Sequence, residues 1–161
     1  MAIVRTCGLF VINDEDEVVC LHPTYHAIDF WSIPKGVLDE GETELEAAIR
    51  ETYEECNINF DINNLVVREL TPQRYKHGKK KLCSFAVLQR DNPDIDFSEF
   101  KLRCNSNVPK ERGNFPEVDA FGWVPIKKAK LFLHYPQVLA LKELYMDKLL
   151  QPIKFCGSFV E

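Results

Sequence analysis

The sequence predicts an α/β fold in which helices pack on a mixed β-sheet. Runs of β-branched and apolar residues occur both as a hairpin and on either side of a helical segment, which is typical of a mixed sheet. One segment repeats its apolar residues every three or four positions, as an amphipathic helix does. The chain has 161 residues, 45% of them apolar, and no linker-like stretch, so we expect a single domain over residues 1–161.

The expected strands are runs of β-branched and apolar residues that end at Gly, Pro, Asn or Asp. They are residues 3–12, 17–22, 30–33, 64–72, 80–90 and 118–126. The first two form a hairpin, because the sequence between them is typical of a turn. Pro34 ends the third strand. A basic turn at His77 and Gly78 separates the fourth from the fifth.

The first expected helix begins after Thr43 and ends near Asn57. Thr43 suits the N-cap, and Glu46 three positions later completes a capping box. Asn57 tolerates the left-handed conformation that a helix end requires. Its apolar residues recur at helical spacing and are Leu45, Ala48, Ile49, Thr52, Tyr53 and Cys56. We therefore expect this face to pack on the sheet.

The remaining segments are less regular. A short helix is expected at residues 127–133 and a longer amphipathic one at 136–150, which Pro152 ends. Residues 91–116 are rich in Pro, Asn, Asp and Ser and are expected to form a long irregular insertion, either a lid or a dimer contact.

Composition excludes two functional classes. The net charge of −5 argues against binding nucleic acid over the whole surface, and no apolar run is long enough to span a membrane. The six cysteines include no C-x-x-C pair, so we expect a reduced, cytoplasmic protein without a disulfide framework or zinc site.

Three carboxylates lie on one face of the first helix, mostly opposite its apolar face. Glu51, Glu54 and Glu55 are spaced i, i+3 and i+4, so they repel one another by roughly 0.2–0.5 kcal/mol per pair. The C-terminal half of a helix also disfavours anions. The cluster is either a solvated acidic face or a cation site. Oxygen ligands of this kind suit Mg²⁺ or Mn²⁺.

The spacing around these carboxylates resembles the Nudix box, G-x5-E-x7-R-E-U-x-E-E-x-G-U, in which U is a bulky aliphatic residue. Residues 36–58 read GVLDEGETELEAAIRETYEECNI. Thr52 replaces an aliphatic residue and Asn57 replaces a glycine, but no charged position differs. The flanking WSIPKG and FPEVDAFGWVPIKKA stretches also resemble the family. The resemblance implies an α/β/α sandwich and a metal-dependent pyrophosphohydrolase.

The resemblance assigns roles to residues of the box. Glu54 and Glu55 match metal ligands, and Glu51 matches either a further ligand or the base that activates water. Arg50 is expected to act with them, and Arg50 and Glu42 match a supporting pair that orients the helix carboxylates. Beside the box, Lys35 is expected to offer its backbone carbonyl to the metal and to contact substrate, and Gly36 is the box glycine in a supporting role.

Outside the box the resemblance is closest to dinucleoside polyphosphate hydrolases. Glu117 lies six residues before Trp123 and matches a further carboxylate at the metal, with Asp119 as the competing residue. Glu117 is otherwise a surface residue of a loop. Tyr75 lies at the spacing of a ring that stacks on a base. It is otherwise a half-buried tyrosine of a strand.

Basic residues surround Tyr75. Arg74, Lys79 and Lys81 are expected to bind phosphates beyond the metal, and the alternative is a solvated basic turn. A dinucleoside polyphosphate is therefore the expected substrate. The alternatives are a diphosphoinositol polyphosphate, another nucleoside diphosphate derivative, or a non-catalytic nucleotide sensor of the same fold. Capped RNA is the one nucleic acid left open as a partner, and the oligomeric state is also open.

Overall fold

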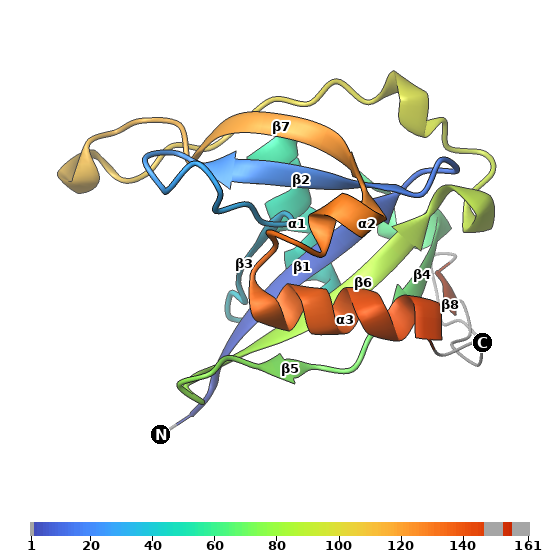
Figure 1. Cartoon of the computed structure of the whole chain (residues 1–161), viewed down its shortest axis with the longest axis horizontal. Helices are drawn as coiled ribbons and strands as arrows, with labels where there is room; N and C mark the ends of the chain where they lie inside the picture. Colours follow the sequence, from blue (N-terminus) through green and yellow to red (C-terminus); the bar gives the residue numbers. More distant parts are fainter. Residues whose placement is uncertain (1, 147–152, 156–161) are drawn as a thin grey trace.

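We describe a computed structural model of the chain over residues 2–146 and 153–155. Eight strands form a mixed sheet in the order β7-β2-β1-β6-β4-β8, with β3 paired to β1 and β5 paired to β6 (Figure 1). The strands are β1 (Val4–Ile12), β2 (Glu17–Pro23), β3 (Lys35–Val37), β4 (Leu65–Glu69), β5 (Gln73–Arg74), β6 (Lys80–Leu88), β7 (Val118–Pro125) and β8 (Ile153–Phe155). The helices are α1 (Glu44–Cys56), α2 (Ile126–Ala129) and α3 (Tyr135–Met146).

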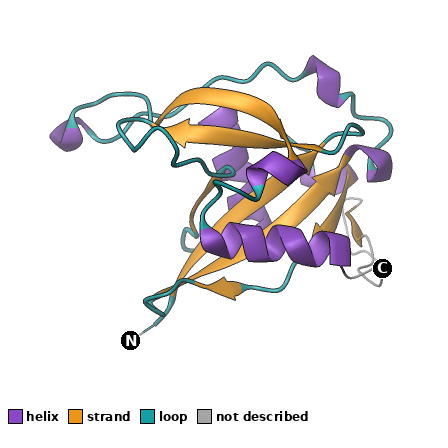
Figure 2. Cartoon of the chain, viewed as in Figure 1, coloured by secondary structure: helices purple, strands orange, loops and turns teal. Residues whose placement is uncertain are grey.

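Helices cover both faces of the sheet, which confirms the expected α/β/α sandwich. In Figure 2, α3 crosses in front of the sheet and α1 lies behind it. The centre of the sheet is β1 paired parallel with β6 over nine residues. Seven consecutive residues of each strand are buried, as expected for a strand with a covered face on both sides. One core lies between the sheet and α1, and the other lies between the sheet and α2 and α3.

The helix α1 begins and ends where the sequence predicts. The Thr43 side chain accepts from the Glu46 N–H, and the Glu46 carboxylate accepts from the Thr43 N–H, so both halves of the capping box form. Asn57 adopts the left-handed conformation, with φ of 65°. The predicted apolar face is wrong at Tyr53, which is 43% exposed, while Ala47 is fully buried instead. The buried face is thus rotated slightly toward Ala47.

The strand expected at residues 30–33 is wrong. Trp31 and Ser32 make only isolated bridges, and the regular strand β3 follows Pro34 instead of ending at it. The reason is non-local. The Leu9 N–H donates to the Pro34 carbonyl at 3.2 Å, and the extended chain after the proline then pairs with β1.

Other expected elements are correct in type but differ in extent. The strand expected at 64–72 is the shorter β4, which ends at Glu69, and β5 begins only after Pro72, which has no N–H to donate to the sheet. The short helix is the single turn α2, and the long helix is described as far as Met146, so residues 147–150 and Pro152 lie outside the described residues. The segment 91–116 is irregular as expected, with three-residue 3₁₀ turns at Phe97–Glu99 and Lys110–Arg112.

The hairpin of β1 and β2 is confirmed, although the two strands pair only beside their turn, at Ile12 and Val18. Farther along, β2 pairs with β7 and contacts Ser32, so the strands diverge. None of the described helices has the length and apolar character needed to cross a membrane.

Candidate active site

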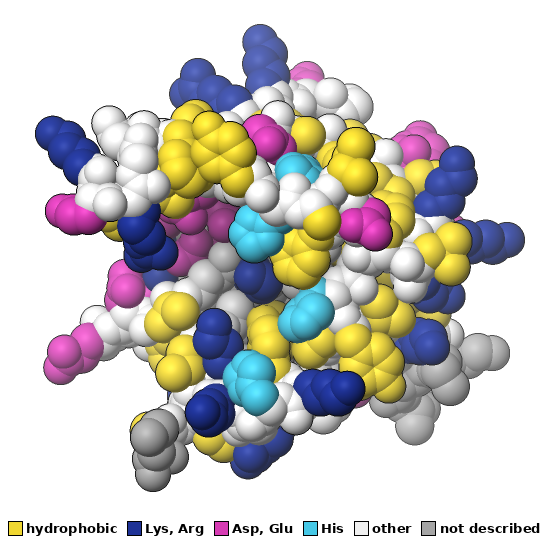
Figure 3. Space-filling model, turned by 60° about the vertical axis from the view of Figure 1, so that its left-hand side comes forward, with side chains coloured by type: hydrophobic (Ala, Val, Ile, Leu, Met, Phe, Trp, Pro, Cys, Tyr) yellow, Lys and Arg dark blue, Asp and Glu magenta, His cyan; other side chains and the backbone are white. Residues whose placement is uncertain are grey.

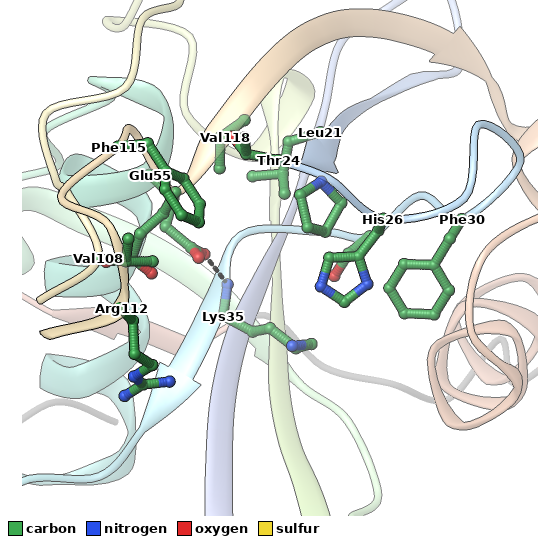
Figure 4. Close-up of a pocket in the computed structure, with 13 residues that line it drawn as sticks. Leu21, Thr24, His26, Phe30, Lys35, Glu55, Val108, Arg112, Phe115 and Val118 are labelled. Carbon is green, nitrogen blue, oxygen red and sulfur yellow. Dashed lines mark hydrogen bonds between the residues drawn. The ribbon is translucent and has the colours of Figure 1, made fainter.

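A cavity of about 450 Å³ opens where α1, the β2–β3 connection and the insertion meet. Lys35 forms its floor, and the carboxylates of Glu55 and Glu117 line it. Figure 4 shows Phe115 and Arg112 of the insertion on one side and His26 and Phe30 on the other. The space-filling view in Figure 3 shows acidic side chains gathered inside this hollow.

Glu55 is the most strongly perturbed acid of the site. Its carboxylate accepts a 2.7 Å hydrogen bond from the Lys35 backbone N–H. Protein surrounds this carboxyl closely, and the resulting desolvation raises its pKa to about 8 in spite of that hydrogen bond. The charges of Glu51 and Glu117 raise it further. A pKa near neutrality is expected of a carboxyl group that exchanges protons in a reaction or binds a cation.

Arg50 organises the other carboxylates of the helix. Its Nε donates to Glu42 at 2.7 Å, and its Nη1 donates to Glu51 at 2.8 Å. The same Nη1 reaches both Glu54 oxygens at 3.3 Å. The hydrogen bond from Arg50 lowers the pKa of Glu42, as expected for a carboxylate paired with a guanidinium. The repulsion predicted along the helix is therefore relieved in part, because Arg50 lies four residues before Glu54.

Gly36 leaves room for Glu51. A Cβ at Gly36 would collide with the Glu51 carboxylate, so the close approach of β3 to α1 requires a residue without a side chain. The Glu51 side chain is 13% exposed. Burial raises its pKa, and the hydrogen bond from Arg50 opposes that effect. The acidic face of the helix is thus not a solvated one at Glu51 or Glu55.

The carboxylates do not converge on one point. Among the described residues, no group of three or more His, Cys, Asp or Glu side chains is arranged to hold a metal ion. The physical reason is the pairing already described: Glu51 and Glu54 turn toward Arg50, whereas Glu55 faces Lys35 and the cavity. The donors are nonetheless all oxygens, and within residues 2–146 and 153–155 no Lys or Arg side chain bonds the desolvated Glu55 carboxyl, which suits a hard divalent ion.

Glu117 lies inside the cavity and Asp119 does not. Asp119 instead bonds His22 Nδ1 at 2.7 Å. Residues two apart face the same side of a regular strand, so strand alternation does not separate these two carboxylates. Glu117 precedes β7, and the pairing of β2 with β7 shifts register between His22 and Pro23.

Tyr75 lies outside the cavity lining but is joined to it by a row of rings. We call His26, Phe30, His134, Tyr75 and His77 the ring row. Successive ring centroids along it are 5.1, 6.2, 5.1 and 5.9 Å apart. In Figure 3 the histidines extend away from the acidic hollow, with Lys and Arg side chains beside them.

The three predicted phosphate-binding cations cluster beside the far end of the ring row. Arg74 pairs with Lys81 across β5 and β6, and Lys79 lies in the turn between these strands. None of them lines the cavity, so they are placed to contact only a substrate that extends beyond it.

Sequence reasoning missed Phe30, Arg112 and Phe115 as lining residues, and for His26 the sequence is compatible with both a cleft and an exposed surface. The only local signal was the presence of Phe115 in the FPEV stretch before Glu117. Phe30 and Arg112 have no periodic pattern around them, so their place depends on how two loops fold.

Comparison with known proteins agrees with this geometry. The NUDIX domain family model matches residues 3–146. An RNA pyrophosphohydrolase of Bartonella henselae is 27% identical over 143 residues, covering 76% of each chain. An RNA pyrophosphohydrolase of Psychrobacter sp. is 30% identical over 129 residues, covering 73% of this chain and 67% of that protein.

A solved structure has the same fold. The Ap4A hydrolase of C. elegans, in a binary complex, superposes with a TM-score of 0.58 at 21% identity, covering 87% of this chain and 95% of that one. The family match over most of the chain, together with the glutamates and arginine of the box, establishes that this chain belongs to the Nudix family and is a hydrolase of phosphoanhydride bonds.

Proposed function

We propose that this protein is a divalent-metal-dependent pyrophosphohydrolase whose preferred substrate is a dinucleoside polyphosphate. One observation carries the proposal. A desolvated Glu55 carboxyl, with its pKa raised to about 8, faces a cavity beside Glu117 and the Arg50–Glu51–Glu54 network. An acidic site of this kind repels a free polyphosphate, but it suits a polyphosphate that is complexed to magnesium, because the cation neutralises negative charge.

The residues that would hold Mg²⁺ or Mn²⁺ are Glu51, Glu54, Glu55, Glu117 and the Lys35 carbonyl. The metal, when bound, neutralises phosphate charge and lowers the pKa of the attacking water. Arg50 would keep Glu51 and Glu54 oriented, and Glu42 would hold Arg50 in place.

In the reaction, the water oxygen bonds to phosphorus, the bridging P–O bond breaks, and the water proton passes to a carboxylate. Glu51 and Glu55 both have raised pKa values, which favours either of them as the proton acceptor. The electron pair of the broken bond stays on the leaving phosphate.

The ring of Tyr75 supports a base-containing substrate, because an aromatic face stacks on any base. Its position beside Arg74, Lys79 and Lys81 suits a polyphosphate that leads from the cavity to a nucleoside. A diphosphoinositol polyphosphate would use the cations without needing the ring. A non-catalytic sensor is disfavoured, because Glu42, Arg50, Glu51, Glu54 and Glu55 are all present.

A second candidate substrate is RNA with a 5′-polyphosphate. Two matched relatives are named RNA pyrophosphohydrolases, and the ring row offers several stacking faces in sequence beyond the cavity. Successive aromatic faces are typical of sites that bind single-stranded nucleic acid.

The experiment is a hydrolysis panel with Mg²⁺, comprising a dinucleoside tetraphosphate, a 5′-triphosphorylated oligonucleotide and a diphosphoinositol phosphate. Tyr75→Ala should lower kcat/KM for the dinucleotide by roughly ten- to a hundredfold, the effect of losing one stacked base, and should leave inositol hydrolysis nearly unchanged. Tyr135→Ala, at an exposed tyrosine outside the cavity, is the matched control. A wild-type preference for the inositol compound, or for RNA, would overturn the substrate assignment.

A further inference from the structure

A second cavity of about 480 Å³ adjoins the first. Thr24, Phe115 and Val118 line both, so the two are neighbours with Phe115 between them. The second cavity lies on the insertion side of Phe115. Figure 4 shows His26 and Phe30 on the opposite side of the first cavity. The acidic site therefore has a hollow on one side and the ring row on the other.

Aromatic rings and one pair of opposite charges line the second cavity. The rings are those of Tyr25, Phe115 and Phe121, and the charges are those of Arg103 and Asp119. The Tyr25 ring meets the Phe115 ring edge to face, with centroids 4.7 Å apart and planes at 71°. Although it makes this contact, Tyr25 is 82% exposed, which leaves most of its ring available to a ligand.

The backbone holds Tyr25 in a conformation that a bulky residue rarely adopts. Its φ is 66°, in the left-handed region. Two hydrogen bonds on either side fix the turn: the Thr24 N–H donates to the Glu117 carbonyl at 2.9 Å, and the His26 N–H donates to the Pro23 carbonyl at 3.1 Å. The turn that carries Tyr25 is therefore held to the backbone of Glu117. Strain of this kind is typical of functional sites.

These properties match a nucleoside. Exposed rings stack on a base, a guanidinium binds phosphate, and a carboxylate accepts from sugar hydroxyls. The volume lies within the range of small-molecule sites, about 300–1,000 Å³.

We propose that the cavity beyond Phe115 binds the second nucleoside of a dinucleoside polyphosphate. The polyphosphate then crosses the first cavity beside Glu55 and Glu117, and the first nucleoside lies toward Tyr75. This inference rests on the proposed function, and it predicts that a substrate with a nucleoside at each end is preferred to one with a single nucleoside.

The test compares a dinucleoside tetraphosphate with the matching nucleoside tetraphosphate, which lacks only the second nucleoside. The quantity measured is the ratio of their kcat/KM values. Tyr25→Gly removes the ring and suits the positive φ, so the turn is retained. Tyr25→Phe keeps the ring, and Tyr135→Ala is the matched exposed control.

We expect Tyr25→Gly to lower the ratio by roughly ten- to a hundredfold, as for the loss of one stacked base, while Tyr25→Phe and Tyr135→Ala retain the wild-type ratio. A wild-type enzyme that cleaves the dinucleotide, together with an unchanged ratio in Tyr25→Gly, would overturn this inference and leave the proposed function intact. An equal loss on both substrates would also overturn it. A wild-type enzyme that does not cleave the dinucleotide would overturn both.

Discussion

Glu55 shows how one residue acquires its chemistry from its surroundings. Its side chain leaves the same helix face as Glu54, yet Glu55 lines the cavity and accepts from the Lys35 N–H, whereas Glu54 faces Arg50. Removal from water raises its pKa to about 8, whereas Arg50 and solvent remain close to Glu54. Neighbouring positions of one helix thus place their carboxylates in different surroundings.

The first prediction follows from this shift. A carboxyl whose pKa rises on folding favours the folded state while it is protonated, so its contribution is complete below pH 4.5 and is lost progressively up to about pH 8. In chelator-treated buffer at pH 8, the free energy of unfolding of Glu55→Gln, measured with urea, should therefore exceed that of the wild type by up to about 4 kcal/mol. This difference in the free energy of unfolding should disappear below pH 4.5. Turnover of the variant with Mg²⁺ should fall by orders of magnitude. A gap of the same size at all pH values would contradict this account of Glu55.

A second residue-scale prediction concerns Glu117, which faces the cavity. If it acts on the metal or the attacking water, Glu117→Gln should lower kcat more than it raises KM, because the interaction is made chiefly in the transition state. Glu111→Gln, an exposed change in the same insertion, is the control. Steady-state kinetics on the dinucleotide distinguishes the two outcomes, and a change confined to KM would return Glu117 to the role of a loop residue.

At the scale of elements, the insertion is fastened to the end of α1. The Asn105 N–H donates to the Glu54 carbonyl at 2.7 Å, and its side chain donates to Tyr53 and Asn57 oxygens at 3.0 and 2.9 Å. The Asn57 side chain in turn donates to the Lys101 carbonyl at 2.9 Å. The residue that replaces the box glycine thus joins the insertion to the helix that carries the glutamates.

The third prediction tests this attachment. Asn105→Ala removes the two hydrogen bonds that its side chain donates to the helix end and one that it accepts from Arg103 Nε, and should lower the free energy of unfolding by roughly 1–3 kcal/mol. Asn63→Ala, at an exposed asparagine that lies outside the attachment, should change it by less than about 0.5 kcal/mol. Chemical denaturation measures both. Equal effects of the two changes would show that the attachment does not stabilise the helix end.

At the scale of the whole molecule, the site lies where three separate parts of the fold meet. The helix α1 contributes Glu55, the start of β3 contributes Lys35, and the segment before β7 contributes Glu117. The two cores on either face of the sheet hold these parts in register. A ligand that contacts all three must therefore stabilise the assembled fold.

The fourth prediction uses that coupling. A cation that binds only the folded state raises stability in proportion to the logarithm of its concentration. Mg²⁺ should raise the Tm of the wild type by several degrees over the chelated protein, and should raise that of Glu55→Gln by much less. Thermal denaturation across a magnesium titration measures the two shifts. Equal shifts would place any bound magnesium away from Glu55.

The sequence by itself determined the helix that carries the chemistry. Thr43, Glu46 and Asn57 define its two ends through contacts within a few residues, and a helix places residues at i, i+3 and i+4 on one face in any context. The family, the carboxylate cluster and its arginine could be predicted from the sequence, because they too depend on the spacing of residues along one helix. The helices and strands that bury an apolar face were also predictable, because the spacing of apolar residues is a property of the sequence alone.

Only the tertiary structure decided which groups face the cavity. The local pattern predicted a strand that ends at Pro34, but pairing with β1 places the strand β3 after this proline. Glu117 and Asp119 were competing candidates in the sequence, and they are separated because Glu117 precedes β7 where the pairing with β2 shifts register, while Asp119 bonds His22. Phe115, Arg112 and Tyr25 reach their places through loops, where no repeat predicts direction. Such positions depend on contacts between residues far apart in the chain, and local spacing holds no record of those contacts.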